Sequence, residues 1–307
     1  MADPEATGDM LVIGCGYSAR ALARRLVGRG WRVRGTTRSA ETAEALRAEG
    51  IEPLLWPLAD PAAALEGADH LLASAAPGPQ GDPALAALGG PIAARAAQFR
   101  WAGYLSTTGV YGDHSGGWVD EGAPLEPATE RGRARVAAEA AWRELHESAG
   151  LPLHVFRLAG IYGPGRGPFE KVRNGTARRI VKPGQVFSRI HVEDIATVLE
   201  ASIARPDPGA AYNVCDDDPA PPQDVIGFAA RLLGLPPPPE VAFEDAELSP
   251  MARSFYAESK RVSNARLKRE LGVRLAYPDY RSGLAAVMAA EGLSPSPSPS
   301  PSASPRA

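Results

Sequence analysis

The chain has 307 residues, 44% of them hydrophobic, which is enough to bury one large core or two modest ones. It carries 33 basic and 36 acidic residues, and a formal charge of −3 provides no cationic field, so nucleic acid is excluded as the expected partner. It has only two cysteines, its N-terminus lacks a secretory pattern, and no apolar run approaches the roughly 18 residues that cross a bilayer, so we expect a cytoplasmic protein without disulfides or membrane contact.

The first half of the chain alternates apolar strands with amphipathic helices. A helix with apolar residues at helical spacing follows the first strand and ends near Gly28. Strands are expected at 10–13, 31–36, 54–56, 70–75, 103–107 and 153–157, and further helices at 40–49, 91–100 and 129–148. This alternation is typical of βαβ units and predicts an α/β fold with a parallel sheet.

Beyond Gly160 the pattern changes, because glycines and prolines become dense and helices become shorter. A strand near 211–214 is expected to return to the main sheet. We therefore expect four parts: a flexible N-terminus at 1–9, an α/β domain at 10–158, a smaller α-rich lobe at 159–292 and a disordered Ser-Pro tail at 293–307.

The first strand runs into a Gly-x-Gly-x-x-Ala motif that opens a helix. Gly14 permits a tight turn, Gly16 lets the backbone approach a pyrophosphate, and Ala19 lets the helix pack closely on the sheet. Tyr17 and Ser18 then present backbone N–H groups at the positive end of the helix. The alternative is an ordinary glycine turn, but the context favours a dinucleotide site in the domain at 10–158.

The second strand ends in Thr37-Arg38-Ser39, where an NAD site usually carries Asp or Glu for the ribose hydroxyls. The Arg38 guanidinium suits a 2′-phosphate, and the hydroxyls of Thr37 and Ser39 can assist it. The sequence therefore predicts NADP, with NAD the less favoured cofactor. The alternative for Arg38 is a solvated loop cation.

Six segments together resemble the extended, epimerase/dehydratase-like branch of the short-chain dehydrogenase/reductase superfamily, over roughly residues 10–290. They are GCGYSAR (14–20), LSTTGVYGD (105–113), FRLAGIYGPGR (156–166), RIHVEDIA (189–196), YNVCDD (212–217) and KRVSNARLKRELG (260–272). The resemblance implies a seven-stranded, doubly wound Rossmann sheet with a substrate between the sheet and the smaller C-terminal lobe. It also aligns Thr107 with the catalytic Ser/Thr of the branch, although capping of the strand end is an equal alternative.

Members of this branch normally carry Tyr-x-x-x-Lys at the start of the long helix, and here these positions hold Arg131 and Arg135. Arginine stays protonated up to a pKa above about 12, so Arg131 is a poor general acid or base. Arg135 can still donate to ribose hydroxyls, and Arg131 can bind a substrate phosphate or carboxylate. We expect Glu139 or an anionic ligand to offset their repulsion. A solvent-facing basic stripe is the alternative.

Other residues are candidates for moving the proton. Tyr111 and Tyr162 are expected in loops near the nicotinamide, where the first often packs beneath such loops and the second often lines the pocket. A further pool follows Tyr111 in the chain: Asp113, His114, Asp120 and Glu121.

The smaller lobe offers few sites. A helix is expected to begin within 189–194, and His191 lacks the accompanying ligands of a metal site, so we expect no metal. Arg261, with Arg253 and Lys260, occupies a segment where relatives hold substrate phosphates, but a solvated charged face is the alternative.

Two functions remain open at this level. The first is an NADP-linked oxidoreductase or nucleotide-sugar epimerase/dehydratase with altered catalytic groups, acting on a small molecule that is anionic or nucleotide-linked. The second is a non-catalytic NADP-binding sensor or scaffold. Homodimerisation through helices flanking the sheet is also open, although the helix expected at 91–100 is short.

Overall fold

A seven-stranded parallel sheet forms the centre of the computed structural model, which describes residues 7–295. In sheet order the strands are β11 (Ala211–Val214), β7 (Leu153–Leu158), β5 (Trp101–Thr107), β4 (His70–Ala73), β1 (Asp9–Ile13), β2 (Arg32–Thr37) and β3 (Glu52–Leu55). The chain runs outward from β1 first through β2 and β3 and then through β4, so the order of strands reverses between β1 and β4. This is the Rossmann arrangement, and the predicted fold class is confirmed.

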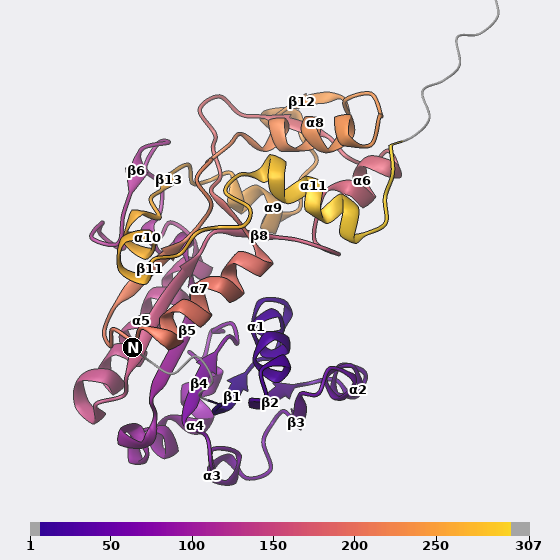
Figure 1. The fold of residues 1–307 in the computed structure, drawn as a ribbon. Coiled ribbons are helices and arrows are strands. Elements are labelled where there is room, and N and C mark those ends of the chain that lie inside the picture. The colour runs from indigo at the N-terminus through magenta and orange to yellow at the C-terminus, as the bar shows by residue number, and fades with distance from the viewer. Residues whose placement is uncertain (1–6, 296–307) are drawn as a thin grey trace, which may run out of the picture.

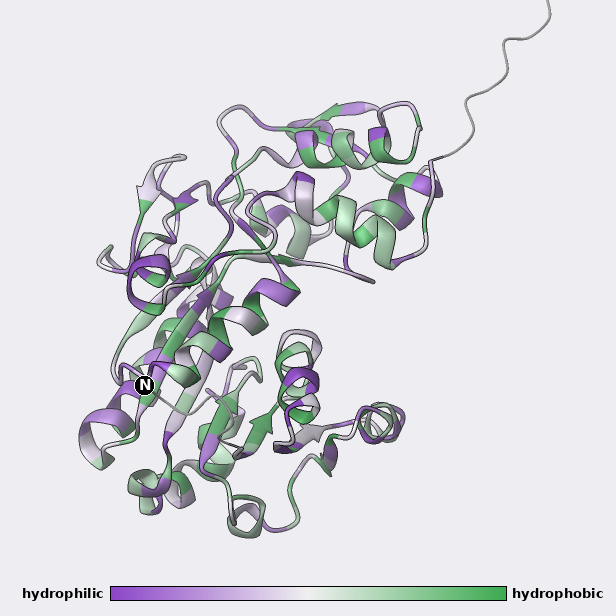
Figure 2. Cartoon of the chain, viewed as in Figure 1, coloured by the Kyte–Doolittle hydropathy of each residue, from purple (hydrophilic) through white to green (hydrophobic). Residues whose placement is uncertain are grey.

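Helices cover both faces of the sheet (Figure 1). Along β1, Met10 and Val12 belong to one apolar cluster and Leu11 and Ile13 to another, which is why the strand is an unbroken apolar run. The first cluster lies against α1 (Tyr17–Gly28), α7 (Val192–Ala204) and α10 (Ala265–Leu271). The second lies against α4 (Pro83–Ala94), α5 (Glu130–Ala149) and the residues that follow α3 (Pro61–Ala64). Helix α2 (Ala40–Ala48) packs beside β2 and β3. The central strands are accordingly the greenest in Figure 2.

The prediction of a helix at 91–100 is wrong, because the helix lies earlier in the chain. Helix α4 begins at Pro83, where the Asp82 carboxylate accepts hydrogen bonds from Ala84 N (2.8 Å) and Leu85 N (3.1 Å), and a short 3₁₀ turn occupies 96–98. Gly89, Gly90 and Pro91 are poor helix formers that disguise this helix in the sequence. Burial of Leu88 and Ile92 against the sheet supports the helix despite them.

The helix expected to begin within 189–194 begins in the middle of that range, because the first three residues form a strand. Residues 189–191 form β10 (Arg189–His191), which pairs with β8 (Gly160–Tyr162), and α7 starts at Val192. His191 caps this helix, since its Nδ1 accepts a hydrogen bond from Glu193 N at 3.2 Å. The N-cap of α7 is therefore the imidazole of His191, and no metal is needed to explain the position of this side chain.

The smaller lobe has an apolar cluster of its own around Phe169, Ala229 and Val287. Its helices are α6 (Phe169–Arg173), α8 (Pro222–Leu232), α9 (Pro250–Phe255) and α11 (Tyr280–Ala290), and its short strands are β9 (Arg179–Val181) paired with β12 (Glu240–Ala242) and β13 (Arg261–Val262) paired with β6 (Trp118–Val119). Strand β11, expected to return to the main sheet, pairs in parallel with β7. Residues 1–6 and 296–307, within the expected flexible N-terminus and Ser-Pro tail, lie outside the described part.

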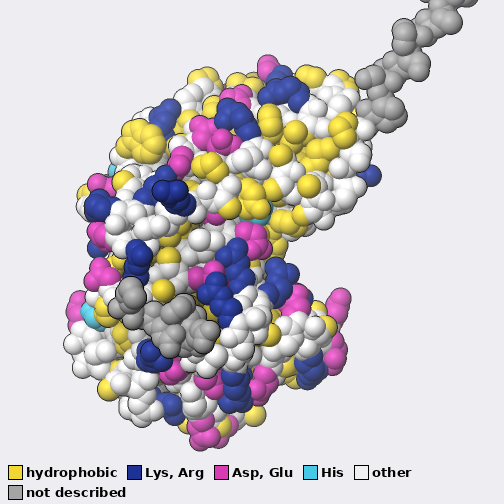
Figure 3. All heavy atoms as spheres, in the orientation of Figure 1, with side chains coloured by type: hydrophobic (Ala, Val, Ile, Leu, Met, Phe, Trp, Pro, Cys, Tyr) yellow, Lys and Arg dark blue, Asp and Glu magenta, His cyan; other side chains and the backbone are white. Residues whose placement is uncertain are grey.

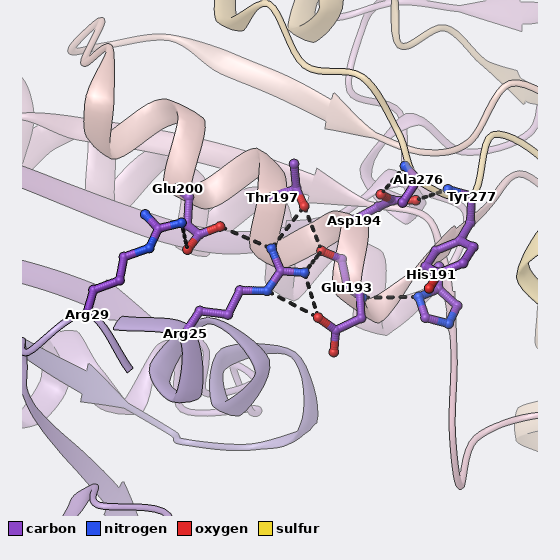
Figure 4. Close-up of polar contacts among 9 residues, drawn as sticks. All are labelled: Arg25, Arg29, His191, Glu193, Asp194, Thr197, Glu200, Ala276 and Tyr277. Carbon is purple, nitrogen blue, oxygen red and sulfur yellow. Dashed lines mark hydrogen bonds and ion pairs between the residues drawn. The ribbon is translucent and has the colours of Figure 1, made fainter. Parts of the chain in front are cut away.

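An ion-pair network joins α1 to α7 (Figure 4). Arg25 bonds to the Glu193 carboxylate at 2.6 Å and to Glu200 at 3.0 Å, and Arg29 reaches the other oxygen of Glu200 at 3.1 Å. Next to Glu193 on the same helix, the Asp194 carboxylate accepts hydrogen bonds from the backbone N–H groups of Ala276 and Tyr277. Helix α7 thus connects the helix that follows the glycine turn with the chain that leads into α11.

The buried His154 predicts how stability responds to acid. It stacks on Trp101 at 5.7 Å, its Nε2 accepts from Asp207 N at 2.9 Å, and burial lowers its pKa from 6.5 to about 4. Because the unfolded chain then protonates first, this residue stabilises the fold above pH 6.5 and the contribution is lost as the pH falls toward about 4.

We therefore expect the free energy of unfolding, measured in urea, to fall between pH 6.5 and 4 more steeply in the wild type than in His154→Gln. The difference in slope should approach about 1.4 kcal/mol per pH unit, the value for one proton. His191, whose pKa burial also lowers to about 4, adds the same trend to both proteins. Equal slopes for the two would contradict a neutral imidazole at position 154.

Candidate dinucleotide site

The turn after β1 is held in a conformation that requires glycine. Gly14 has φ +83°, and its N–H donates to Thr36 Oγ1 on β2 at 2.7 Å. A Cβ at position 14 would lie 2.8 Å from the backbone nitrogen of Ala75, which follows β4. The turn is therefore squeezed between β2 and the segment after β4, at the point where the order of strands reverses.

The next glycine of the motif faces open space. A Cβ at Gly16 would meet only the oxygen of Gly14, at 4.0 Å, although its backbone (φ −92°) is one that any residue can adopt. Gly16 is the N-cap of α1 and supplies no side-chain cap, and the first turn of α1 carries no acidic residue. The N–H groups of Tyr17 and Ser18 thus begin a 12-residue helix with room in front of them, which fits the diphosphate of a dinucleotide.

The tip of β2 carries the predicted specificity residues. Arg38 is exposed and makes no ion pair with any described residue. Thr37 Oγ1 accepts from Ser39 N at 3.3 Å, and Ser39 Oγ accepts from Thr42 N at 3.1 Å as the N-cap of α2. The two hydroxyls therefore shape the start of α2, while the guanidinium is left facing solvent.

A cavity beside the turn was missed by reasoning from the sequence. It has a volume of about 630 Å³, within the range of small-ligand pockets, and it is lined by Trp56 after β3, by Ala76 and 78–81 after β4, and by the first turns of α4. Ala75, which contacts Gly14, immediately precedes this lining. The signal in the sequence was the glycine- and proline-rich segment 76–83 at the carboxyl end of a buried strand.

Thr107 lies half-buried at the end of β5, and its Oγ1 accepts from Gly109 N at 3.2 Å, so the capping alternative is observed. Arg135 lies beside the same strand, where its Nη1 donates to Leu105 O at 2.7 Å and to Tyr104 Oη at 3.0 Å. Its remaining guanidinium nitrogens have no hydrogen-bond partner among residues 7–295. The structure thus brings Thr107 and Arg135 to the carboxyl end of one strand.

Arg131 and Arg135 have different neighbours among the described residues, and Glu139 is not the partner of either. The Arg131 guanidinium stacks over the ring of Phe255, which belongs to α9 of the smaller lobe, at 4.7 Å. Glu139, expected to offset their repulsion, instead pairs with Arg157 at 2.8 Å and accepts from Ser106 Oγ. The repulsion is relieved because the two arginines turn to different neighbours.

The two tyrosines considered for proton transfer are both buried. Tyr111 donates to Asn213 Oδ1 at 2.7 Å and accepts from Arg157 at 2.9 Å, and burial raises its pKa to about 12. Tyr162 packs in the apolar cluster of the smaller lobe with its hydroxyl 3.4 Å from Asp279 O, and burial raises its pKa as well. Both hydroxyls are therefore buried and hydrogen-bonded within the protein, and Tyr162 lies in an apolar cluster and not in a loop that lines a pocket.

The polar residues that follow Tyr111 serve the local structure. Asp113 accepts from Ser259 N at 2.7 Å, a hydrogen bond that lowers the pKa of its carboxyl, and His114 Nε2 contacts the carbonyl of Tyr111. Asp120 accepts from Gly122 N, and Glu121 accepts from Asn213 N.

The basic residues of the smaller lobe bind backbone carbonyls. Arg261 donates to Gly116 O, Lys260 to Gly112 O, and Arg253 to Ala246 O. Among the described residues, no group of three or more His, Cys, Asp or Glu side chains is placed to hold a metal ion. The side chain of Arg261, which was predicted to contact the substrate, is therefore already hydrogen-bonded to the backbone.

Comparison with known proteins decides the family. Residues 92–215 match the model of the NAD dependent epimerase/dehydratase family. The chain is also 32% identical to Protein YeeZ of Escherichia coli K12 over 282 residues, which covers 87% of this chain and 96% of YeeZ. The chain belongs to the NAD-dependent epimerase/dehydratase family.

Solved structures share the fold. A conserved protein of unknown function from Silicibacter pomeroyi is 65% identical and superposes with a TM-score of 0.89, covering 92% of this chain and 99% of its own. The UDP-glucuronic acid 4-epimerase of Bacillus cereus, solved in complex with NAD, has the same fold at 15% identity and a TM-score of 0.72, covering 91% of this chain and 96% of its own. Within residues 7–295 we find no helix with the length and apolar character to cross a membrane.

Proposed function

We propose that this member of the family is an NADP-linked enzyme, an oxidoreductase or nucleotide-sugar epimerase/dehydratase with altered catalytic groups. The observation that carries the proposal is the uncapped N-terminus of α1 at the reversal of the sheet, with the unpaired Arg38 at the tip of the neighbouring strand. Family membership and the fold shared with an NAD-bound epimerase support the dinucleotide. Arg38 in place of an acidic residue supports the 2′-phosphate.

Different residues would hold different parts of the cofactor. The N–H groups of Tyr17 and Ser18 would hold the diphosphate, Arg38 the 2′-phosphate, and Arg135 the ribose next to the nicotinamide. When bound, the nicotinamide supplies or accepts a hydride at its C4 atom. Thr107 stands at the end of β5 to hydrogen-bond the reacting oxygen of a substrate, as the aligned residue of the family does.

The substrate we propose is a small anionic or nucleotide-linked molecule. Arg131 lies at the first turn of α5, and its planar guanidinium can bind a phosphate or carboxylate through two hydrogen bonds. Because it stays protonated, Arg131 orients the substrate and does not move a proton.

A specific observation favours the non-catalytic alternative. Arginines occupy both positions of the usual proton relay, and Tyr111 and Tyr162 are buried and hydrogen-bonded. A protein that binds NADP without turnover, as a sensor or scaffold, is consistent with that arrangement. Hydride transfer distinguishes this alternative from the enzyme.

Cofactor selectivity tests the role of Arg38. We expect NADPH to bind the wild type more tightly than NADH by roughly 10- to 100-fold, because a charge-assisted hydrogen bond contributes about 1.5–3 kcal/mol. Arg38→Ala should remove the gap by weakening NADPH alone, as measured by calorimetric titration. Arg47→Ala, a surface arginine paired with Glu44 on α2, is the matched control and should keep the gap. Equal affinities in the wild type would refute NADP selectivity.

Isotope transfer tests catalysis. NADPH carrying deuterium at C4 is incubated with the protein and a panel of sugar nucleotides and carbonyl compounds, and products are analysed by mass spectrometry. We expect deuterium in at least one product, and slower transfer in Thr107→Val because the reacting oxygen loses a donor. If NADPH binds but no compound acquires deuterium, and no sugar nucleotide is epimerised or dehydrated with NADP⁺ present, the sensor alternative replaces the enzyme. The second condition is needed because an epimerase returns the substrate's own hydride and takes up none from added NADPH.

A further inference from the structure

A tight hairpin at 163–166, in the chain that follows β8, is pressed against the first residue of α1. The hairpin is closed by the bonds from Gly163 N to Arg166 O (3.4 Å) and from Arg166 N to Gly163 O (2.9 Å). Tyr17 Oη donates to Pro164 O at 2.9 Å. A Cβ at Gly163 would lie 2.5 Å from Tyr17 Oη and 2.7 Å from a methyl group of Val192, so the two surfaces are in close contact.

The hairpin places a cation beside the start of α1. The guanidinium carbon of Arg166 lies 5.7 Å from the centre of the Tyr17 ring. The side chain is exposed and has no hydrogen bond or ion pair with any residue between 7 and 295. On the other side, Gly165 N donates to the Glu291 carboxylate at 2.9 Å, which fixes the tip of the hairpin.

The start of α1 and the Arg166 guanidinium both attract an anion. The N-terminus of a helix carries a partial positive charge, and a cation near it is repelled by a few tenths of a kcal/mol or more. The first turn of α1 has no acidic residue. Neither nearby carboxylate forms an ion pair with Arg166, since Glu193 binds Arg25 and Glu291 accepts a hydrogen bond from Gly165 N. An anion in front of Tyr17 would be attracted by both the helix and Arg166.

We propose that Arg166 is a ligand of the cofactor diphosphate, supplied by the smaller lobe. The inference rests on the proposed function, because the diphosphate is the anion that the start of α1 would hold. Stacking on Tyr17 leaves the N–H groups of the guanidinium free to form a two-pronged contact with phosphate oxygens. The dinucleotide then contacts both lobes, and Figure 3 shows the surface hollowed at the right between the smaller lobe and α1.

The test compares two probes that share a 2′-phosphate but differ in the diphosphate. NADPH contains both groups, whereas adenosine 2′-monophosphate contains only the first. We expect Arg166→Ala to weaken NADPH roughly ten-fold or more, as loss of a charge-assisted contact implies, and to leave adenosine 2′-monophosphate unchanged. Arg166→Lys should recover part of the affinity, because the charge returns without the planar fork.

A control variant and a measurement of folding accompany this test. Arg173→Ala removes another exposed arginine of the same lobe, at the end of α6, and should leave NADPH binding unchanged. Thermal unfolding of the free proteins checks that each variant folds. If Arg166→Ala binds NADPH like the wild type, or loses both probes equally, the inference is overturned while the proposed function stands. If the wild type binds neither probe, the proposed function itself fails.

Discussion

The close approach of the turn at Gly14 to the neighbouring strands is the constraint on which the site depends. Its backbone fits between Thr36 on β2 and Ala75 after β4, with no room for a side chain. This contact fixes where α1 begins, with open space in front of its N-cap, Gly16. The turn brings the open space at Gly16 and the solvent-facing Arg38 to one edge of the sheet, where the proposed dinucleotide would use both.

Helix α1 also contacts two segments from the second half of the chain. At its start, Tyr17 contacts the hairpin of the smaller lobe, and further along, Arg25 pairs with Glu193 and Glu200 on α7. These ion pairs are partly exposed, and each such pair contributes at most about 1 kcal/mol on its own, so their main effect is to set orientation. Helix α5 departs from the usual pattern of the family, because Arg131 and Arg135 replace the tyrosine and lysine and turn toward Phe255 and the end of β5.

The sequence was sufficient for the parts that depend on local pattern. Alternating apolar strands and helices predicted the Rossmann sheet, and a glycine motif between a strand and a helix predicted the turn. The sequence was insufficient where tertiary packing decides which segments are helical and which side chains are buried. The Gly89-Gly90-Pro91 run hides a helix that burial of Leu88 and Ile92 supports. Likewise, only long-range partners, Asn213 for Tyr111 and Asp279 for Tyr162, reveal that the two tyrosines are buried.

Binding of NADPH to Gly16→Asp tests the account most directly. A side chain at this position meets nothing closer than the oxygen of Gly14, and aspartate is a favoured helix N-cap, so the melting temperature should be unchanged or higher. The added carboxylate would occupy the place of the diphosphate and repel its negative charge. We therefore expect calorimetry to detect NADPH binding in the wild type and none in the variant. A variant that binds NADPH as tightly as the wild type would contradict a diphosphate held at the start of α1.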